Sequence, residues 1–127
     1  MTTHVLHATT LGDISKALQA LHQHLLQFQA RRSFFYGSPL ELFDHATKDA
    51  AFAWLKPLRE AIVTLDERRA AKEPISEGEA KALGDELRGL LEAETGTFRD
   101  QLNAAFQFDP ETIWAVGKAR KSLSALA

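Results

Sequence analysis

The sequence predicts an all-α protein that folds as an antiparallel bundle of four to six helices, three of them long. Apolar residues recur at alternating spacings of three and four, which is the pattern of one buried helix face. Capping signals such as Ser-x-x-Glu and Asp-Pro precede several of these segments. No segment alternates apolar and polar residues over the length of a strand, and no Asn-Gly or Asp-Gly turn is present.

The composition is that of an ordinary globular domain. The chain has 127 residues, of which 45% are hydrophobic and 25% charged, so we expect a single helical-bundle domain at 13–127 after a flexible N-terminal tail at 1–12. The net charge of −2 argues against nucleic-acid binding. We expect no membrane span and no secretory signal. The absence of cysteine excludes a thiolate zinc site and a cysteine nucleophile, and it fits a cytoplasmic location.

A first long helix is expected from about Asp13 to Phe35. Arg32 falls where its apolar stripe asks for an apolar residue. Gly37 is suited to the left-handed conformation that ends many helices, so we expect the helix to stop at Tyr36-Gly37. The residues of the stripe are Ile14, Leu18, Leu21, Leu25 and Phe28.

Ser38-Pro39-Leu40-Glu41 predicts the start of a short second helix that extends to about Thr47. Ser38 and Glu41 are spaced to form a capping box, and Pro39 suits a first turn, where its missing N–H is not needed. The apolar anchors expected for this helix are Leu40, Leu42 and Phe43.

The segment from Asp49 to about Lys72 is expected to be the central packing helix. Asp49 is placed to cap it. Pro57 lies inside the segment and cannot donate to the carbonyl of Ala53, so we expect this central helix to be kinked or broken near Pro57. The apolar residues of the segment are Ala51, Phe52, Trp54, Leu55, Leu58, Ile62 and Leu65.

Two further helix starts are marked by Ser76-Glu77-Gly78-Glu79 and by Asp109-Pro110. A turn at 94–97 is expected to separate a fourth helix from a short fifth one. The residues expected to face inward along these last helices are Ala80, Leu83, Leu87, Leu90, Leu91, Phe98, Leu102, Ala105, Phe106, Ile113, Trp114, Val116, Ala119 or Arg120, and Leu123.

Several short motifs in this chain are distinctive as a set. They are Phe52-Ala53-Trp54-Leu55-Lys56-Pro57-Leu58, then Ile62-Val63 and Asp66-Glu67, preceded by Leu21-His22 and Ser38-Pro39. In these motifs, and over most of its length from about Leu21 to Leu123, the chain resembles a family of small, uncharacterised, all-helical bacterial proteins. The resemblance implies a cytoplasmic helical protein and carries no activity, ligand or catalytic residue with it.

Histidine and carboxylate side chains are the first candidates for a functional site. Glu41, His45 and Asp49 are spaced by four residues and share one helix face. His22 lies beside the stripe of the first helix, whereas His24 points outward. The chain has neither the Glu-x-x-His pairs of di-iron bundles nor a His-Glu-x-x-His motif, so no metal ligand set and no cofactor is assigned. A structural role and a metal or proton-transfer site are the two interpretations of these histidines.

Arg32 is a second candidate because an inward-facing arginine needs a carboxylate partner. Asp66 and Glu67, at the end of the central stripe, are the expected partners. A helix-bridging ion pair, or an arginine that extends past Phe28 to water, is the structural interpretation. Binding of a small anionic ligand is the functional one.

The aromatic residues are numerous for a small bundle, and they cannot all face inward together. Phe34, Phe35 and Tyr36 are consecutive, so at least one of them needs another surface to cover it. An exposed apolar patch usually marks an interface, and a symmetric homodimer is the commonest assembly. We therefore expect a homodimer.

Taken together, the sequence favours a non-catalytic helical interaction or ligand-binding module, with itself or another protein as its partner. The alternative is a metal- or small-molecule-dependent helical enzyme that uses histidines and carboxylates. A third hypothesis is docking through the acidic segment 73–100, which holds three Lys or Arg residues against eight Asp or Glu residues.

Overall fold

The computed structural model describes residues 8–73 and 75–126. Within these ranges the chain forms six α-helices and two short 3-10 helices, and no β-strand. The all-α prediction is therefore confirmed. The elements are α1 (Ala8–Arg32), α2 (Pro39–Lys48), η1 (Ala50–Leu55), α3 (Lys56–Ala70), α4 (Glu77–Glu92), α5 (Thr97–Phe108), α6 (Glu111–Ser122) and η2 (Leu123–Leu126).

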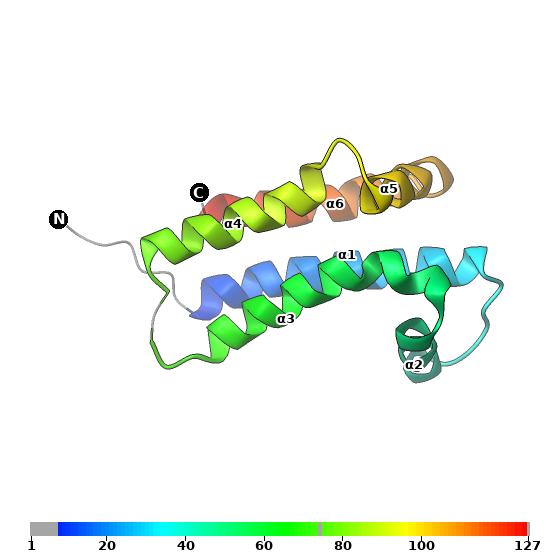
Figure 1. The fold of residues 1–127 in the computed structure, drawn as a ribbon, viewed down its shortest axis with the longest axis horizontal. Helices are drawn as coiled ribbons and strands as arrows, with labels where there is room; N and C mark the ends of the chain where they lie inside the picture. Colours follow the sequence, from blue (N-terminus) through cyan, green and yellow to red (C-terminus); the bar gives the residue numbers. More distant parts are fainter. Residues whose placement is uncertain (1–7, 74, 127) are drawn as a thin grey trace.

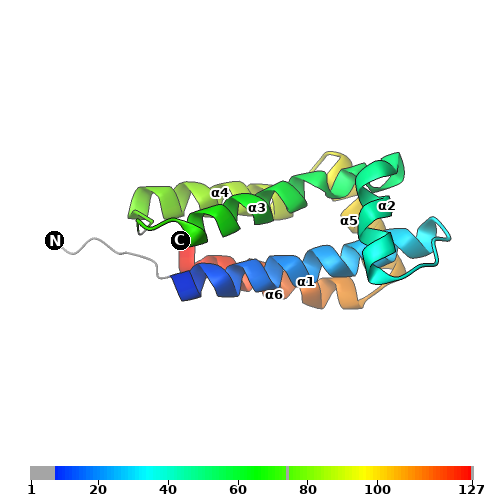
Figure 2. The same cartoon turned by 90° about the horizontal axis from the view of Figure 1, so that it is seen from below.

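Four helices, α1, α3, α4 and α6, lie lengthwise beside one another, and the shorter α2 and α5 lie across one end of the bundle (Figures 1 and 2). The first helix packs against both α3 and α6. It runs antiparallel to α3, because Ser15 near one end of α1 donates to Asp66 of α3, and Gln29 near the other end accepts from Trp54 of η1.

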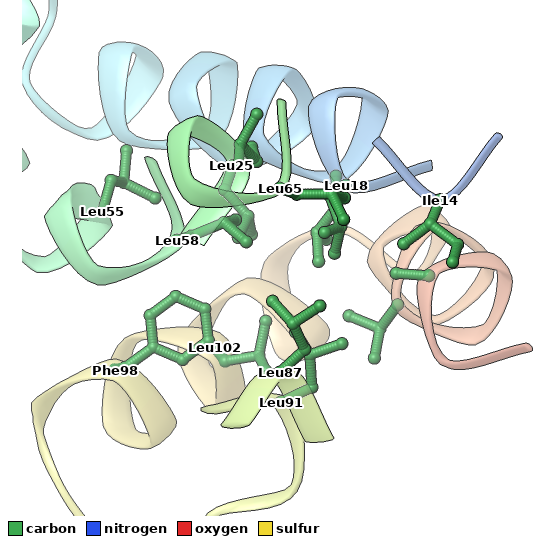
Figure 3. Close-up of a cluster of buried hydrophobic side chains, with 14 of the residues drawn as sticks. Ile14, Leu18, Leu25, Leu55, Leu58, Leu65, Leu87, Leu91, Phe98 and Leu102 are labelled. Atoms are coloured by element: carbon green, nitrogen blue, oxygen red, sulfur yellow. The ribbon is translucent and has the colours of Figure 1, made fainter. Parts of the chain in front are cut away.

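The core is built mainly from leucine side chains, and each of the helices α1 to α6 contributes apolar side chains to it (Figure 3). Trp54 is also buried, and its indole Nε1 donates to Gln29 Oε1 at 2.9 Å, so neither polar group is left unsatisfied. The side chains labelled in the core are Ile14, Leu18 and Leu25 of α1, Leu55 of η1, Leu58 and Leu65 of α3, Leu87 and Leu91 of α4, and Phe98 and Leu102 of α5.

The central segment is divided near Pro57, as predicted. The helix expected from Asp49 consists of two parts, η1 and α3, that meet at Lys56. Pro57 lies in the first turn of α3, where no backbone N–H is required of it. The side chain of Asp49 caps η1 by accepting from the backbone N–H of Ala51 at 2.8 Å. The predicted kink is thus a change of helix type.

The prediction of a flexible tail is wrong for residues 8–12, and its remainder, 1–7, lies outside the described residues. The first helix begins at Ala8, five residues before the expected start. Leu11 is buried and continues the apolar stripe by one step of three residues before Ile14. Gly12 is also buried, because the side chain of Arg69 lies over its backbone. Tertiary packing of this first turn therefore extends the helix.

The end of α1 also differs from the prediction, which placed the left-handed residue at Gly37. The helix ends at Arg32, and Phe34 has the left-handed conformation, with φ of 54°. Two hydrogen bonds close the turn: the Phe34 N–H donates to the Arg31 carbonyl at 3.2 Å, and the Phe35 N–H donates to the Ala30 carbonyl at 2.9 Å. Gly37 has a different role, since a Cβ there would lie 2.9 Å from the Phe35 ring.

The left-handed Phe34 generates a stability prediction. Its side chain is 79% exposed, so little packing offsets the steric cost of φ above zero in a residue with a Cβ. We expect Phe34→Gly to raise the free energy of unfolding by about 0.5–1 kcal/mol, the relief of strain being partly offset by the greater freedom of glycine in the unfolded chain. Urea unfolding followed by circular dichroism measures this. Phe34→Ala is the matched control, because it removes the ring but keeps the strained Cβ; equal effects of both substitutions would contradict the strain argument.

The predicted capping box of α2 is confirmed, but two of its predicted anchors are wrong. Ser38 Oγ accepts from the Glu41 N–H at 3.1 Å, and Glu41 Oε1 accepts from the Ser38 N–H at 3.1 Å. Leu42 alone of the three anchors is buried, while Leu40 and Phe43 are exposed. Because α2 lies across the bundle, it buries only one narrow face against the core.

The prediction for the last helix is confirmed for Val116, Ala119 and Leu123, which are buried, and wrong for two other residues. Ile113 and Trp114, expected to face inward, are 60% and 75% exposed. The contact of α6 with α1 determines which face of α6 is buried, because the fully buried Thr112 lies beside His24 there. The buried face of this helix and the turn that follows consists of Thr112, Val116, Ala119 and Leu123.

A second prediction concerns two glycines of α4 in different surroundings. A Cβ at Gly84 would lie 2.8 Å from Leu126 Cβ and 3.0 Å from the Leu126 carbonyl oxygen, whereas a Cβ at Gly89 would meet nothing within 4 Å. We expect Gly84→Ala to lower the free energy of unfolding by about 1–3 kcal/mol through overpacking. Gly89→Ala should raise it by up to about 1 kcal/mol through helix propensity. Denaturant unfolding of both variants tests whether η2 packs closely on α4. An increase in the free energy of unfolding in Gly84→Ala would contradict this close packing.

Candidate functional site

A groove with a volume of about 560 Å³ lies on the outer side of the α1–α3 pair and is open to solvent. Two helices supply most of its lining, and α2 adds Phe43. On α1 the lining positions recur at helical spacing over two turns, and on α3 they are i, i+3 and i+4, so each helix presents a single face to the groove. The lining residues are Gln19, Ala20, His22, Gln23, Leu26, Phe43, Arg59, Ile62 and Val63.

Arg59 lines this groove and two smaller hollows next to it. The chain has eight arginines, and within the described ranges seven of them bind a carboxylate, an amide oxygen or a backbone carbonyl. Arg59 has no hydrogen-bond or ion-pair partner among the described residues. The reason is visible in the sequence: the residues three and four positions before and after Arg59 are Leu55, Lys56, Ile62 and Val63, none of them acidic.

His22 lies beside Arg59 in the groove and is partly buried. Burial and, to a smaller extent, the nearby Arg59 guanidinium hold the pKa of His22 below its usual value. The imidazole is therefore neutral at neutral pH, and Arg59 supplies the single formal charge of the groove lining. A lone cation on an otherwise uncharged surface attracts an anionic group rather than a neutral or cationic one.

His45 and Asp49 form the close pair predicted from their spacing, with His45 Nε2 3.0 Å from Asp49 Oδ2. The His45 ring stacks on Phe35, with ring centroids 4.5 Å apart, and meets Phe52 edge-on at 5.4 Å. Glu41 does not join them, because its carboxylate is bound to the Ser38 backbone. These contacts hold α2 against η1 and the end of α1. They support a structural role for the pair of His45 and Asp49.

The two histidine candidates are not brought together into a metal site. His22 lies in the groove of α1 and α3, whereas His45 faces Phe35, Phe52 and Asp49. Across residues 8–73 and 75–126, no three His, Asp, Glu or Cys side chains are grouped closely enough to hold a metal ion. The arrangement thus gives no support to the enzyme alternative that relies on histidines and carboxylates.

The predicted partnership of Arg32 with Asp66 or Glu67 is wrong. Arg32 is exposed; its guanidinium carbon lies 5.2 Å from the centre of the Phe28 ring, and Nη1 donates to Gln101 at 2.6 Å. Asp66 lies near the opposite end of α1, where it accepts from Ser15 at 2.6 Å and lies 3.7 Å from Arg69. Because α1 and α3 are antiparallel in this register, Arg32 and Asp66 lie at opposite ends of the bundle. Extension of Arg32 past Phe28 to water, the other structural interpretation, is the one observed.

A polar cluster that sequence reasoning missed joins α1 to the start of α6. His24, expected to point outward, has Nε2 2.8 Å from Thr112 Oγ1 and 3.4 Å from Asp109 Oδ2. Arg31 also donates to Asp109, at 2.9 Å, and this contact holds the pKa of the carboxyl below its usual value. The sequence identified Asp109 only as a helix cap, a role it also fills by accepting from the Glu111 N–H. The contact with His24 depends on the packing of α6, which spacing alone does not give.

The acidic segment 73–100 is partly neutralised by its neighbours. Glu79 pairs with Arg68 at 3.0 Å, Asp85 with Arg88 at 2.9 Å, and Glu92 with Arg120 at 2.8 Å. These pairs join α4 to α3 and α6 or lie along its surface. They favour a solvated, ion-paired helix face, and docking through this segment stays a hypothesis without a specific contact to support it.

Most of the exposed large apolar side chains gather at one end of the bundle, which we call the apolar end. The contacts of Arg31 with Asp109, of Arg32 with Gln101 and of Phe28 with Phe108 place the C-terminal end of α1 beside α5 and the start of α6. The α1–α2 loop and α2 lie at the same end (Figure 1). The side chains that define the apolar end are Phe34, Tyr36, Leu40, Phe43, Phe108, Ile113 and Trp114.

Comparison with known proteins found no matching protein family, curated protein or solved structure. The resemblance of the motifs around Phe52–Leu58 to a family of helical bacterial proteins therefore stays a prediction. No helix in the described part of the chain has both the length and the apolar character needed to cross a membrane.

The pairing of Arg59 and His22 generates a prediction for Arg59→Gln. Removing the guanidinium should raise the pKa of His22, but not to its ordinary value, because burial is the larger cause of the shift. Titration of the His22 ring by NMR measures this. Lys56→Gln is the matched control: Lys56 lies on the same helix, pairs with Glu60 and does not contribute to the shift. An unchanged pKa in Arg59→Gln, or equal shifts in both variants, would contradict the assignment.

The same lowered pKa makes the stability of the protein depend on pH. The unfolded chain, in which His22 has an ordinary pKa of about 6.5, binds the proton more readily than the folded protein. This part of the stability is therefore complete above about pH 6.5 and decreases as the pH falls towards the lower folded pKa. We expect His22→Gln to show a flatter profile of unfolding free energy between neutral and mildly acidic pH than the wild-type protein.

Proposed function

We propose that this protein is a non-catalytic, cytoplasmic helical interaction module that acts as a homodimer joined through its apolar end. The observation that supports the proposal is the concentration of exposed apolar side chains there, among them Tyr36 at 88% and Trp114 at 75% exposure. Large exposed apolar patches are rare on monomeric proteins and usually mark an interface. The cytoplasmic assignment rests on the absence of cysteine in the chain.

The composition of the apolar end fits an interface between two copies. Aromatic side chains are typical of interface centres, and tryptophan and tyrosine are among the residues that contribute most to the binding energy there. Charged residues that lie beside it, such as Arg31 and Asp109, are paired with each other and so need no partner from outside. A two-fold axis through this end would place the same side chains opposite one another, which is the arrangement of a symmetric dimer.

The proposal predicts a dimer in solution that a single charge disrupts. Light scattering after size exclusion should give twice the chain mass of 14.1 kDa for the wild-type protein and a mass near 14.1 kDa for Trp114→Glu. We expect the dissociation constant to rise by at least about 30-fold, the effect of losing a central aromatic contact worth about 2 kcal/mol. Ala82→Glu, on the exposed face of α4, is the matched control and should stay dimeric. A wild-type monomer over a wide concentration range would exclude the proposal.

A further inference from the structure

We infer that the groove between α1 and α3 binds an amphipathic helix of a partner protein that presents one acidic residue to Arg59. This site differs from the apolar end proposed for dimerisation. The two surfaces share one residue, Phe43, and the groove extends away from it along α1 and α3.

The dimensions of the groove fit a helix. Its lining on α1 extends over residues 19–26, about 10 Å at 1.5 Å per residue. An amphipathic helix that binds through anchors at i, i+3, i+4 and i+7 spans the same distance. Small-molecule sites instead enclose most of their ligand. Here the enclosed recess behind His22 and Phe43 has a volume of only about 10 Å³, so an occupant lies along the open groove with one face in water.

The apolar part of the lining matches the apolar face of such a helix. Leu26 and Ile62 form the floor and are buried, while Phe43 and Val63 are 53% and 51% exposed at its edges. On its other side the α1–α3 pair is covered by α6 and α4, so the groove is where a further helix can pack against both members of the pair. A helix laid there would cover Phe43 and Val63 together.

The charge of the groove lining is the reason to expect an acidic residue on the partner helix. Arg59 is the single charged residue among the groove-lining side chains, and it has no partner in the described part of the chain. His22, neutral at neutral pH, adds no second charge. Covering an unpaired guanidinium with an apolar surface would be unfavourable, whereas a carboxylate at that point gives a charge-assisted pair. A basic residue in the same place is repelled, so the site discriminates by charge as well as by shape.

Selection from a peptide library tests the inference. The probe is a displayed library of 14-residue helices with apolar anchors at i, i+3, i+4 and i+7 and all other positions randomised, selected on the full chain. We expect the selected helices to carry Asp or Glu at one fixed position. Arg59→Gln should weaken their binding about ten-fold, the loss of one hydrogen bond to a charged group. Arg59→Lys should keep part of the affinity, and Lys56→Gln should keep all of it.

A second readout identifies the surface that is bound. On addition of a selected peptide, the NMR signals of the His22 ring should shift, and Val63→Glu should abolish both the shift and the binding. Selected helices without a common acidic position, or with equal sensitivity to Arg59→Gln and Lys56→Gln, would overturn the inference. So would binding that Trp114→Glu abolishes and Arg59→Gln does not, because the peptide would then occupy the apolar end. If Arg59→Gln itself reduces the mass of the assembly, the groove is occupied by a second copy and not by a partner helix.

Discussion

Burial of the apolar stripe of α1 is the constraint on which the rest of the structure depends. Leu18, Leu21 and Leu25 are fully buried, and the helix packs against α3 on one side and α6 on the other. The register of these two contacts follows from the stripe, because each leucine must meet an apolar face of its neighbour. That register then decides which polar groups meet: Ser15 and Asp66 at one end, and Arg31 and Asp109 at the other.

Local signals predicted the elements well, because the groups that form them are close in sequence. The capping box at Ser38, the cap at Asp49 and the division near Pro57 need only three or four residues to be understood. The errors arose where tertiary packing overrides local preference. Phe34 takes the left-handed position because the turn closes there and its neighbour Phe35 packs against the core, although Gly37 is better suited to that conformation.

The site was harder to predict than the fold, since its contacts depend on register. Arg32 and Asp66 were both recognised as charged residues at the edge of an apolar stripe, yet they lie at opposite ends of α1. His24 was expected in water because spacing does not reveal that α6 covers it. Arg59 was overlooked, although its sequence holds a signal: on its own helix it has no acid three or four residues away.

The groove follows from the way in which the bundle is closed. With α4 and α6 covering one side of the α1–α3 pair, and α2 lying across only its end, the other side of the pair remains open beyond Phe43. An open groove between two helices normally carries polar residues, but on the face of α3 that lines this one Arg59 is followed by the buried Ile62 and the exposed Val63. The acids nearest along the helix are engaged elsewhere, Glu60 with Lys56 and Asp66 with Ser15. Apolar edges and an unpaired guanidinium together are the complement of an acidic amphipathic surface.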